Sequence, residues 1–372
     1  MKTLRNVLLN TRNNKLVPAI IHFEDKIASI EYLTENEFDW SEINTSEKRD
    51  IKLHQFKLEQ SDVSSEVIDG NFNLLMYGSL DSHVHFDTPG FESKEDIEHA
   101  SYSAAAGGVT CVVDMPCTSI PPVTTVKNLL FKKESLKNRS KIDYAFLGGI
   151  NNGNADKNNT IRKNIEYLIA EGVPGFKVYT ISGMSTFKDL SYSEIAHIAD
   201  IIKKTNTRLA VHAEDKLTIK TKMAEFQFKN QTDWKAYCES RSIEAEVKAV
   251  EKLIEISKKS GAHIHVVHLS SKNGLGLISA AKKEGIKITT ETCPHYLYFT
   301  QKDFENKSIS NFLKTAPPVK FEEDKEALWL GLADGSIDYI TTDHAGCDPM
   351  LEKMTSNFWN VYGGIPGVQH RV

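Results

Sequence analysis

The segment of the sequence that most suggests chemistry is "GSLDSHVHFDTPG", residues 78–90, in which His83 and His85 are separated by one residue. Side chains alternate between the two faces of a β-strand, so histidines at this spacing on a strand point to the same side and can bind one metal ion together. Imidazole is a common zinc ligand. The spacing alone fits a histidine pair in a surface turn equally well, so the rest of the chain has to decide.

Further polar side chains fall at or near the ends of other strand-like segments. They are Lys177 in "GFKVY", His212 in "VHAED", His268 in "HIHVVHLSS" and Asp343 in "ITTDHA". The carboxyl ends of the strands of a parallel barrel meet at one face, where active sites are found. A single strand-end histidine is more often a hydrogen-bonded rim residue than a ligand. Because so many metal-binding side chains fall at one rim, the pattern favours a metal site.

Eight strand-like runs follow residue 77, with amphipathic helical segments between them. Strands are predicted at 77–86, 109–115, 142–150, 175–180, 208–214, 263–270, 286–294 and 336–345, and helices at 93–106, 192–204 and 244–260. Parallel strands need helical crossovers, and closure of the sheet removes its edges. We therefore predict an α/β fold, a (β/α)8 barrel of the TIM type, over residues 78–372.

Residues 1–77 are predicted to form the N-terminal part of a small β-sandwich domain. The runs "KLVPAIIHF" and "KIASIEYL" have the composition of short strands. Residues 35–65 are polar, acidic and rich in turn formers, and are predicted to form a loop.

Composition excludes several classes of protein. The 372 residues carry 45 Lys and Arg against 50 Asp and Glu, a net charge of -5 with no basic patch, which argues against a nucleic-acid partner. Five cysteines without a CxxC pair argue against a disulfide framework and fit a reducing compartment. No run of about 18 apolar residues and no signal peptide is present, so we expect no membrane partner and a cytoplasmic location.

Lys177 is the unusual member of the polar set, because a buried ammonium is unfavourable and cannot coordinate a cation. One interpretation is that it pairs with a buried carboxylate. The other is that a low-dielectric site lowers its pKa, so that the neutral amine takes up carbon dioxide. The resulting carbamate would give one oxygen to each of two metal ions.

A series of motifs along the chain resembles one known family. The motifs are "VIDGNFNLLMYGSLDSHVHF", "AAAGGVTCVVDMPCTSIPPVTT", "GFKVYTISGM", "VHAED", "HIHVVHLSS", "TTETCPHYLYFT", "KTAPPV", "LADGSIDYITTDHA" and "GGIPGVQ". In this order they resemble the cyclic amidohydrolases of the amidohydrolase superfamily, which include dihydroorotases, allantoinases and hydantoinases (dihydropyrimidinases). The resemblance implies a small-molecule substrate and a homo-oligomer, either a dimer or a tetramer.

The resemblance also implies a binuclear centre, usually of zinc. One ion would be held by His83, His85, carboxylated Lys177 and Asp343, and the other by Lys177, His212 and His268. A hydroxide that bridges the two cations would attack the amide carbonyl. Asp343 would accept its proton and pass it to the leaving nitrogen. Two further residues at the rim, Cys117 and His344, are candidate substrate contacts.

The substrate is predicted from departures within the family. Dihydroorotases carry an arginine soon after the HxH pair and an asparagine in an "MPN" motif, and both bind the acidic substrate. Asp87 and Cys117 stand at those positions here. Because an aspartate repels an acidic ring, we expect an allantoinase-like enzyme for a cyclic ureide or imide without a strong carboxylate, with dihydroorotate as the alternative.

Two other classes remain open. A mononuclear deaminase also uses an HxH pair, two more histidines and an aspartate, with a glutamate in the place of Glu214. A non-catalytic scaffold related to dihydropyrimidinase is the alternative that is not an enzyme. Glu214 is either a carboxylate that orients a histidine ligand or a salt-bridged loop residue, and His263 and His265 are predicted to be structural.

The family pattern continues beyond residue 372 with a closing helix and the rest of the sandwich. The lead-in "NLLMYGSL" also lacks the usual proline-glycine turn. We expect the 372-residue chain alone to be poorly soluble or weakly active, because an incomplete sandwich exposes strand edges. A version extended by the missing part, or supplied with it as a separate polypeptide, should regain solubility and activity.

Overall fold

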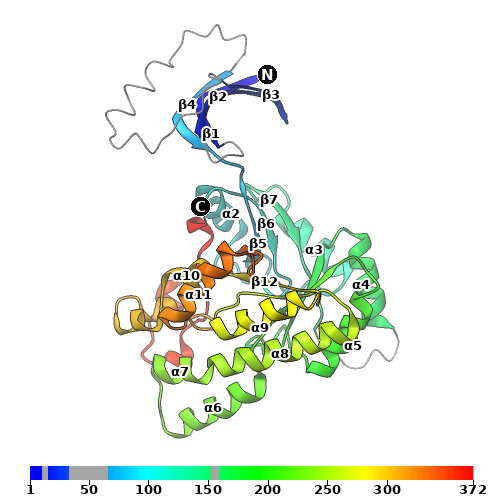
Figure 1. Cartoon of the computed structure of the whole chain (residues 1–372), viewed down its shortest axis with the longest axis vertical. Helices are drawn as coiled ribbons and strands as arrows, with labels where there is room; N and C mark the ends of the chain where they lie inside the picture. Colours follow the sequence, from blue (N-terminus) through cyan, green and yellow to red (C-terminus); the bar gives the residue numbers. More distant parts are fainter. Residues whose placement is uncertain (11–15, 33–65, 152–158, 372) are drawn as a thin grey trace. The chain divides into compact units, whose positions relative to one another are not determined.

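The computed structural model describes residues 1–10, 16–32, 66–151 and 159–371. They form two compact units, Met1–Gly78 and Ser79–Val372 (Figure 1). The loop predicted at 35–65 lies outside the described residues. Among the described helices, none has the length and apolar content needed to cross a membrane.

The first unit contains a four-stranded sheet in the order β3-β2-β1-β4. Its strands are β1 (Lys2–Asn10), β2 (Leu16–Phe23), β3 (Ile27–Tyr32) and β4 (Glu66–Leu75). The two predicted runs correspond to β2 and β3, whereas β1 and β4 were not predicted. β4 contains Gly70, Asn71 and Asn73, which are typical of turns, and its parallel pairing with β1 is interrupted by a register shift.

The described residues of the second unit form ten strand segments, all paired in parallel. They are β5 (Ser79–His85), β6 (Val109–Asp114), β7 (Asp143–Phe146), β8 (Gly148–Gly149), β9 (Gly175–Tyr179), β10 (Arg208–His212), β11 (Ile264–Val266), β12 (Ile288–Thr292), β13 (Tyr339–Ile340) and β14 (His344–Ala345). They form two sheets, in the orders β14-β5-β6-β7 and β13-β12-β11-β10-β9-β8. The predicted third strand is divided into β7 and β8, and the predicted eighth strand into β13 and β14. Of each pair, one half belongs to one sheet and the other half to the other sheet. The eight predicted strands and the barrel architecture are thereby confirmed.

Helices surround the strands (Figure 1). They are α2 (Ile97–Ala106), α3 (Val126–Leu136), α4 (Thr160–Ala170), α5 (Tyr192–Ile202), α6 (Lys216–Phe228), α7 (Trp234–Ser240), α8 (Ile243–Ser260), α9 (Lys272–Lys283), α10 (Pro294–Tyr298), α11 (Glu322–Ala333) and α12 (Pro349–Glu352). The three predicted helices are confirmed as α2, α5 and α8. α2 begins later than predicted because the Asp96 side chain accepts a hydrogen bond from the backbone N–H of His99 and caps the helix there.

The core lies between the outward face of the strands and the inner faces of the helices. Val84, Phe176 and Val211 from the strands are fully buried in one cluster with Ile198 of α5 and Leu253 of α8. The inward face of the strands is thereby left free for the polar residues. This division explains why near-continuous apolar strands carry single histidines, lysine or aspartate towards their ends.

A buried ion pair links α3 to the end of β6. Lys132 and Asp114 are almost fully buried, and Nζ of Lys132 lies 2.5 Å from Oδ2 of Asp114. We expect Lys132→Met to lower the free energy of unfolding by about 3–5 kcal/mol, because the Asp114 carboxylate would stay buried without its counter-charge. Urea denaturation measures this. The double variant Lys132→Met/Asp114→Asn should recover part of the loss, and a loss below about 1 kcal/mol in the single variant would contradict the role of the pair.

Candidate metal centre

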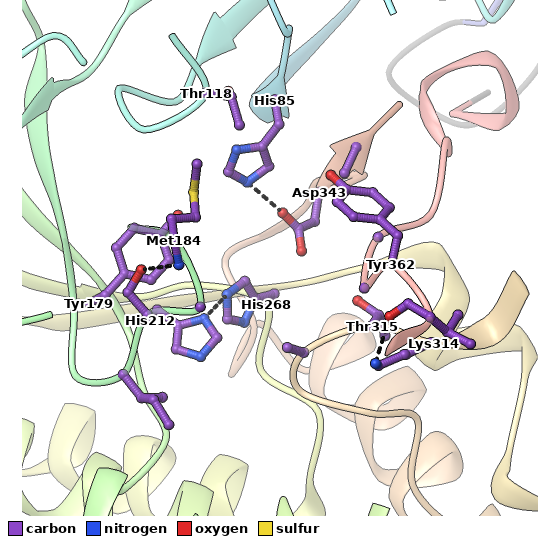
Figure 2. Close-up of a pocket in the computed structure, with 18 of the residues that line it drawn as sticks. His85, Thr118, Tyr179, Met184, His212, His268, Lys314, Thr315, Asp343 and Tyr362 are labelled. Carbon is purple, nitrogen blue, oxygen red and sulfur yellow. Dashed lines mark hydrogen bonds and ion pairs between the residues drawn. The ribbon is translucent and has the colours of Figure 1, made fainter. Parts of the chain in front are cut away.

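The first group of predicted ligands meets where β5 ends and the chain passes from β13 to β14. Nε2 of His83 and Nε2 of His85 each lie 3.1 Å from Oδ1 of Asp343, and Figure 2 shows the contact between His85 and Asp343. Zinc with ligands at about 2.0–2.1 Å in tetrahedral geometry places neighbouring ligand atoms about 3.3 Å apart. Both distances are close to that spacing, and one ligand atom from each of the three side chains lies within 4.8 Å of the other two.

The second group lies beside the first. Nδ1 of His212 and Nε2 of His268 are 3.0 Å apart (Figure 2), and the rings of His268 and His83 have centroids 5.6 Å apart. Nε2 of His212 lies 2.8 Å from Oε2 of Glu214. Since a carboxylate fixes the N–H of a ligating histidine on the far side of the ring, Nδ1 of His212 is the nitrogen left to bind a cation.

Lys177 lies on β9 and is fully buried. Its Nζ has no hydrogen-bond partner among the described residues and lies 5.0 Å from the ring centroid of Tyr179. Burial lowers the pKa of Lys177 to about 8, although Asp343 and Glu291 oppose this shift. The structure therefore does not show the carboxylate partner that one interpretation of the sequence required. A buried amine without a partner calls for another explanation.

The charge balance of the site fits a cation. Burial lowers the pKa of His85, but the neighbouring Cys117 and Asp343 outweigh burial and raise the pKa to about 10. Burial would raise the pKa of Asp343, but His83 and His85 hold it well below its usual value. The surroundings of Asp343 thus favour positive charge, whereas burial lowers the pKa of His212 and His268 and so keeps their rings neutral, the form in which a histidine binds a cation.

Two of the predicted ligands have a backbone conformation that is rare outside glycine. His268 has φ 40° and Asp343 has φ 48°. Left-handed conformations of non-glycine residues cost roughly 1–3 kcal/mol and cluster at functional sites. At both positions the chain turns just past a strand, and this turn directs the side chain into the barrel.

Glu291 on β12 was not identified from the sequence. One of its oxygens contacts Nδ1 of His83, and the other lies 3.2 Å from Nε2 of His265. His265 is held in turn by the hydroxyls of Thr289 and Tyr339, a supporting place that agrees with its predicted structural role. The contact with Glu291 leaves Nε2 of His83 free to face Asp343. The sequence signal that could have identified Glu291 is its position within "TTETCP", a strand that ends at the same rim of the barrel as the predicted ligands.

Glu214 combines the two roles that the sequence left open. Its Oε2 accepts from His212 and also contacts the guanidinium of Arg241. Burial opposes ionisation, but Arg241 and His212 together hold the pKa of Glu214 below its usual value. The ionised carboxylate of Glu214 therefore holds the ring of His212, a predicted ligand, and its negative charge is balanced by the guanidinium of Arg241.

Cys117 and His344 are buried, and neither is among the described residues that line the cavity, so a contact with substrate stays a prediction for both. Sγ of Cys117 lies 3.5 Å from Nδ1 of His85 and 3.1 Å from the Tyr179 hydroxyl. Nε2 of His344 lies 2.6 Å from Oε2 of Glu95, and its Nδ1 accepts from the backbone N–H of Val368. Buried polar atoms need partners, and these side chains already have theirs within the protein.

A cavity of about 630 Å³ opens onto the two ligand groups. Its wall includes His85, His212, His268 and Asp343 together with Thr118, Tyr179, Met184, Lys314, Thr315 and Tyr362 (Figure 2). Asp87 also lines the cavity. Burial raises the pKa of Asp87 to about 8. The volume is typical of a site for a small molecule.

Comparisons with known proteins show the family of the chain. The family model described as "Amidohydrolase family" matches residues 74–363. The chain is 37% identical to an allantoinase of Bacillus velezensis over 307 residues, which cover 82% of this chain and 65% of that protein. It is 37% identical to an allantoinase of Streptomyces avermitilis over 298 residues, or 80% of this chain and 64% of that one. The chain thus spans just under two thirds of these relatives.

Solved structures show the same fold. The L-hydantoinase (dihydropyrimidinase) of Arthrobacter aurescens matches with a TM-score of 0.82 and 28% identity, over 99% of this chain and 74% of that one. A dihydropyrimidinase of Brevibacillus agri matches with a TM-score of 0.82 and 22% identity, over 100% of this chain and 74% of that one. Because the family model covers most of its length, this chain belongs to the amidohydrolase family, in the branch of the cyclic amidohydrolases.

Proposed function

We propose that the chain is a metal-dependent hydrolase that opens the ring of a cyclic amide or ureide. The observation that carries the proposal is the convergence of two ligand groups and the unpartnered Lys177 amine inside one barrel. Identity to allantoinases and to an L-hydantoinase supports the substrate class.

The side chains present fit two divalent cations, for which we propose zinc. His83, His85 and Asp343 would hold one ion, and His212 and His268 the other. Lys177, carboxylated by carbon dioxide, would be shared between them. When bound, the pair of cations makes a water molecule a nucleophile at neutral pH and polarises the carbonyl to be attacked.

The chain's own residues supply orientation and proton transfer. Glu291 and Glu214 fix the rings of His83 and His212 through the nitrogen that faces away from the cavity. Asp343 lines the cavity and is held ionised, so it can take a proton from the attacking water. It would then give this proton to the ring nitrogen as the C–N bond breaks, so that hydroxyl ends on carbon and hydrogen on nitrogen.

A hydrolysis screen of the zinc-loaded chain tests the proposal. Hydantoins, allantoin, dihydropyrimidines and dihydroorotate are the substrates, and ring opening is followed by chromatography, with chelator-treated protein as the control. We expect metal-dependent opening of at least one ring without a carboxylate. Preference for dihydroorotate would favour a dihydroorotase instead. Ammonia release without ring opening would indicate a deaminase, and no turnover at all would contradict the proposal.

The assembly of the chain into a homodimer or homotetramer stays a prediction.

Lys314 holds one wall of the cavity in place. Its Nζ donates to the carbonyl oxygens of Phe358, Trp359 and Val361, at 2.7, 3.0 and 2.6 Å. The segment that it holds supplies Tyr362 to the cavity. We expect Lys314→Met to raise KM by about 10-fold or more with a smaller change in kcat, because an unfixed wall weakens binding of substrate and transition state alike.

Steady-state kinetics and zinc content check this prediction. Lys235→Met removes an exposed lysine that pairs with Glu305 and should leave KM unchanged. Loss of zinc from the Lys314→Met protein, or a fall in kcat with KM unchanged, would contradict a role confined to the wall.

A further inference from the structure

Two buried carboxylates lie close to the predicted ligands without belonging to either ligand group. Asp81 is fully buried and lies on β5, on the same face of the strand as His83 and His85. Glu246 is almost fully buried and lies in the first turn of α8. Burying a carboxylate is unfavourable unless hydrogen bonds stabilise it, so the partners of these two side chains indicate what they hold in place.

Asp81 connects the end of the first barrel strand to the end of the last. Oδ1 of Asp81 accepts a hydrogen bond from the backbone N–H of His83 at 3.2 Å, and both oxygens accept from the backbone N–H of Thr342, also at 3.2 Å. Oδ2 accepts a further one from the Thr342 hydroxyl at 2.5 Å. Thr342 directly precedes Asp343, so one carboxylate fixes the backbone beside two ligands of the first group, His83 and Asp343.

Glu246 has the corresponding place beside the second ligand group. Its Oε1 accepts from the backbone N–H of Ser270 at 2.9 Å and from the Ser270 hydroxyl at 2.8 Å. Ser270 follows His268 by two residues. Glu246 therefore ties the turn that carries His268 to α8, one of the helices that surround the strands (Figure 1).

The turns at His268 and Asp343 need such support. His268 has φ 40° and Asp343 has φ 48°, and both side chains line the cavity (Figure 2). A non-glycine residue keeps a left-handed conformation only where the surrounding structure over-determines it. Without its tie to a buried carboxylate, each turn is expected to relax towards an ordinary conformation and to carry its ligand out of place.

We propose that Asp81 and Glu246 are positioning residues, which hold the Asp343 and His268 turns in the conformation that binds metal before any ion is present. A ligand turn that spends only a fraction of its time in this conformation binds its ion more weakly, in inverse proportion to that fraction. Asp81 acts on the ion of the first group and Glu246 on the ion of the second. This inference rests on the proposed function, because the two ions are those of the proposed centre.

Hydrogen exchange of the metal-free chain measures the hold on each turn directly. Asp81→Ala should raise the exchange rate of the Thr342 amide by about 10-fold or more and leave that of the Ser270 amide unchanged, because only one of the two ties is removed. Glu246→Met fills the space of the glutamate but accepts no hydrogen bond, so it should have the reverse effect. Glu246→Gln, which keeps Oε1, should behave as the wild type does.

Milder variants decide the question if a carboxylate variant does not fold. Thr342→Val and Ser270→Ala each remove only the hydroxyl contact of one tie. Each should raise the exchange rate of the amide at its own position by about 3-fold and leave the other turn unchanged.

Zinc affinity, measured by competition with a chelator, is the second readout. Asp81→Ala and Glu246→Met should each weaken the binding of one of the two ions by about 10- to 100-fold and leave the other within about 3-fold of the wild type. With zinc in excess, kcat should fall about 10-fold in Asp81→Ala, because Asp343 would also carry the proton, but by less than about 3-fold in Glu246→Met.

Asp324→Ala is the matched control. Asp324 is also almost fully buried, and its oxygens accept from the backbone N–H groups of Lys272 at 2.8 Å and Phe321 at 3.1 Å, where α9 and α11 begin. Its loss should lower the free energy of unfolding, as measured in urea, but should leave zinc affinity and the exchange of Thr342 and Ser270 unchanged.

Three results would overturn the inference. They are equal weakening of both ions in each carboxylate variant, an effect on zinc as large in Asp324→Ala, and unchanged exchange of Thr342 in Asp81→Ala and of Ser270 in Glu246→Met. A wild type that binds no zinc would contradict the proposed function instead. The exchange of the metal-free chain then decides the inference: a rise confined to the turn that has lost its tie supports it, and no rise overturns it.

Discussion

Replacing Lys177 by alanine is expected to abolish stable binding of both metal ions and, with it, ring opening. The reason is that a carbamate on Lys177 would be the ligand common to the two ions. A structural role would need a hydrogen-bond partner for the Lys177 amine, and the amine has none among the described residues. Metal analysis of the purified variant and turnover of the best ring substrate measure the effect.

Rescue distinguishes a lost ligand from a damaged fold. Acetate or propionate should restore part of the activity of Lys177→Ala, because a short carboxylate can enter the space that the shortened side chain leaves. Lys177→Met is the matched control: it is also uncharged but fills the space, so the same acids should have no effect. Retention of two metal ions in Lys177→Ala would overturn the binuclear account.

Asp343→Asn is expected to lower kcat by about 10²- to 10⁴-fold with little change in KM. An amide oxygen can still face His83 and His85, but it cannot carry a proton from water to the leaving nitrogen. Steady-state kinetics on protein of measured zinc content tests this prediction.

Asp334→Asn is the matched control for this variant, because Asp334 follows α11 at the other end of the eighth strand and is exposed. It should not change kcat. A residual kcat within about 10-fold of the wild type in Asp343→Asn would assign proton transfer to another residue.

Much of the predicted site could be located from the sequence because of how strands alternate and end. His83 and His85 were recognisable by their spacing, and Lys177 because a lysine is unusual inside an apolar strand. The barrel followed from eight apolar runs with helices between them. Those signals are local, and each is visible in a few residues.

The rest depends on partners that are distant in sequence. Glu291 lies 208 residues from His83, so no local pattern connects them. The breaks at Leu147 and at residues 341–343 divide the third and eighth strands between the two sheets, and no local sequence pattern marks them. Neighbours in sequence also do not share partners: His344 follows Asp343 directly, but its ring contacts Glu95, because successive residues point in different directions.

The number of zinc ions bound per wild-type chain tests the binuclear claim most directly. The protein is purified after expression with added zinc, freed of loosely bound metal and quantified by amino-acid analysis. Elemental mass spectrometry should then find two zinc ions per chain. Two ions are predicted because two ligand groups meet at one cavity and because we propose that Lys177 is shared between them. A constant value of one per fully folded chain would contradict the account and would favour a mononuclear enzyme.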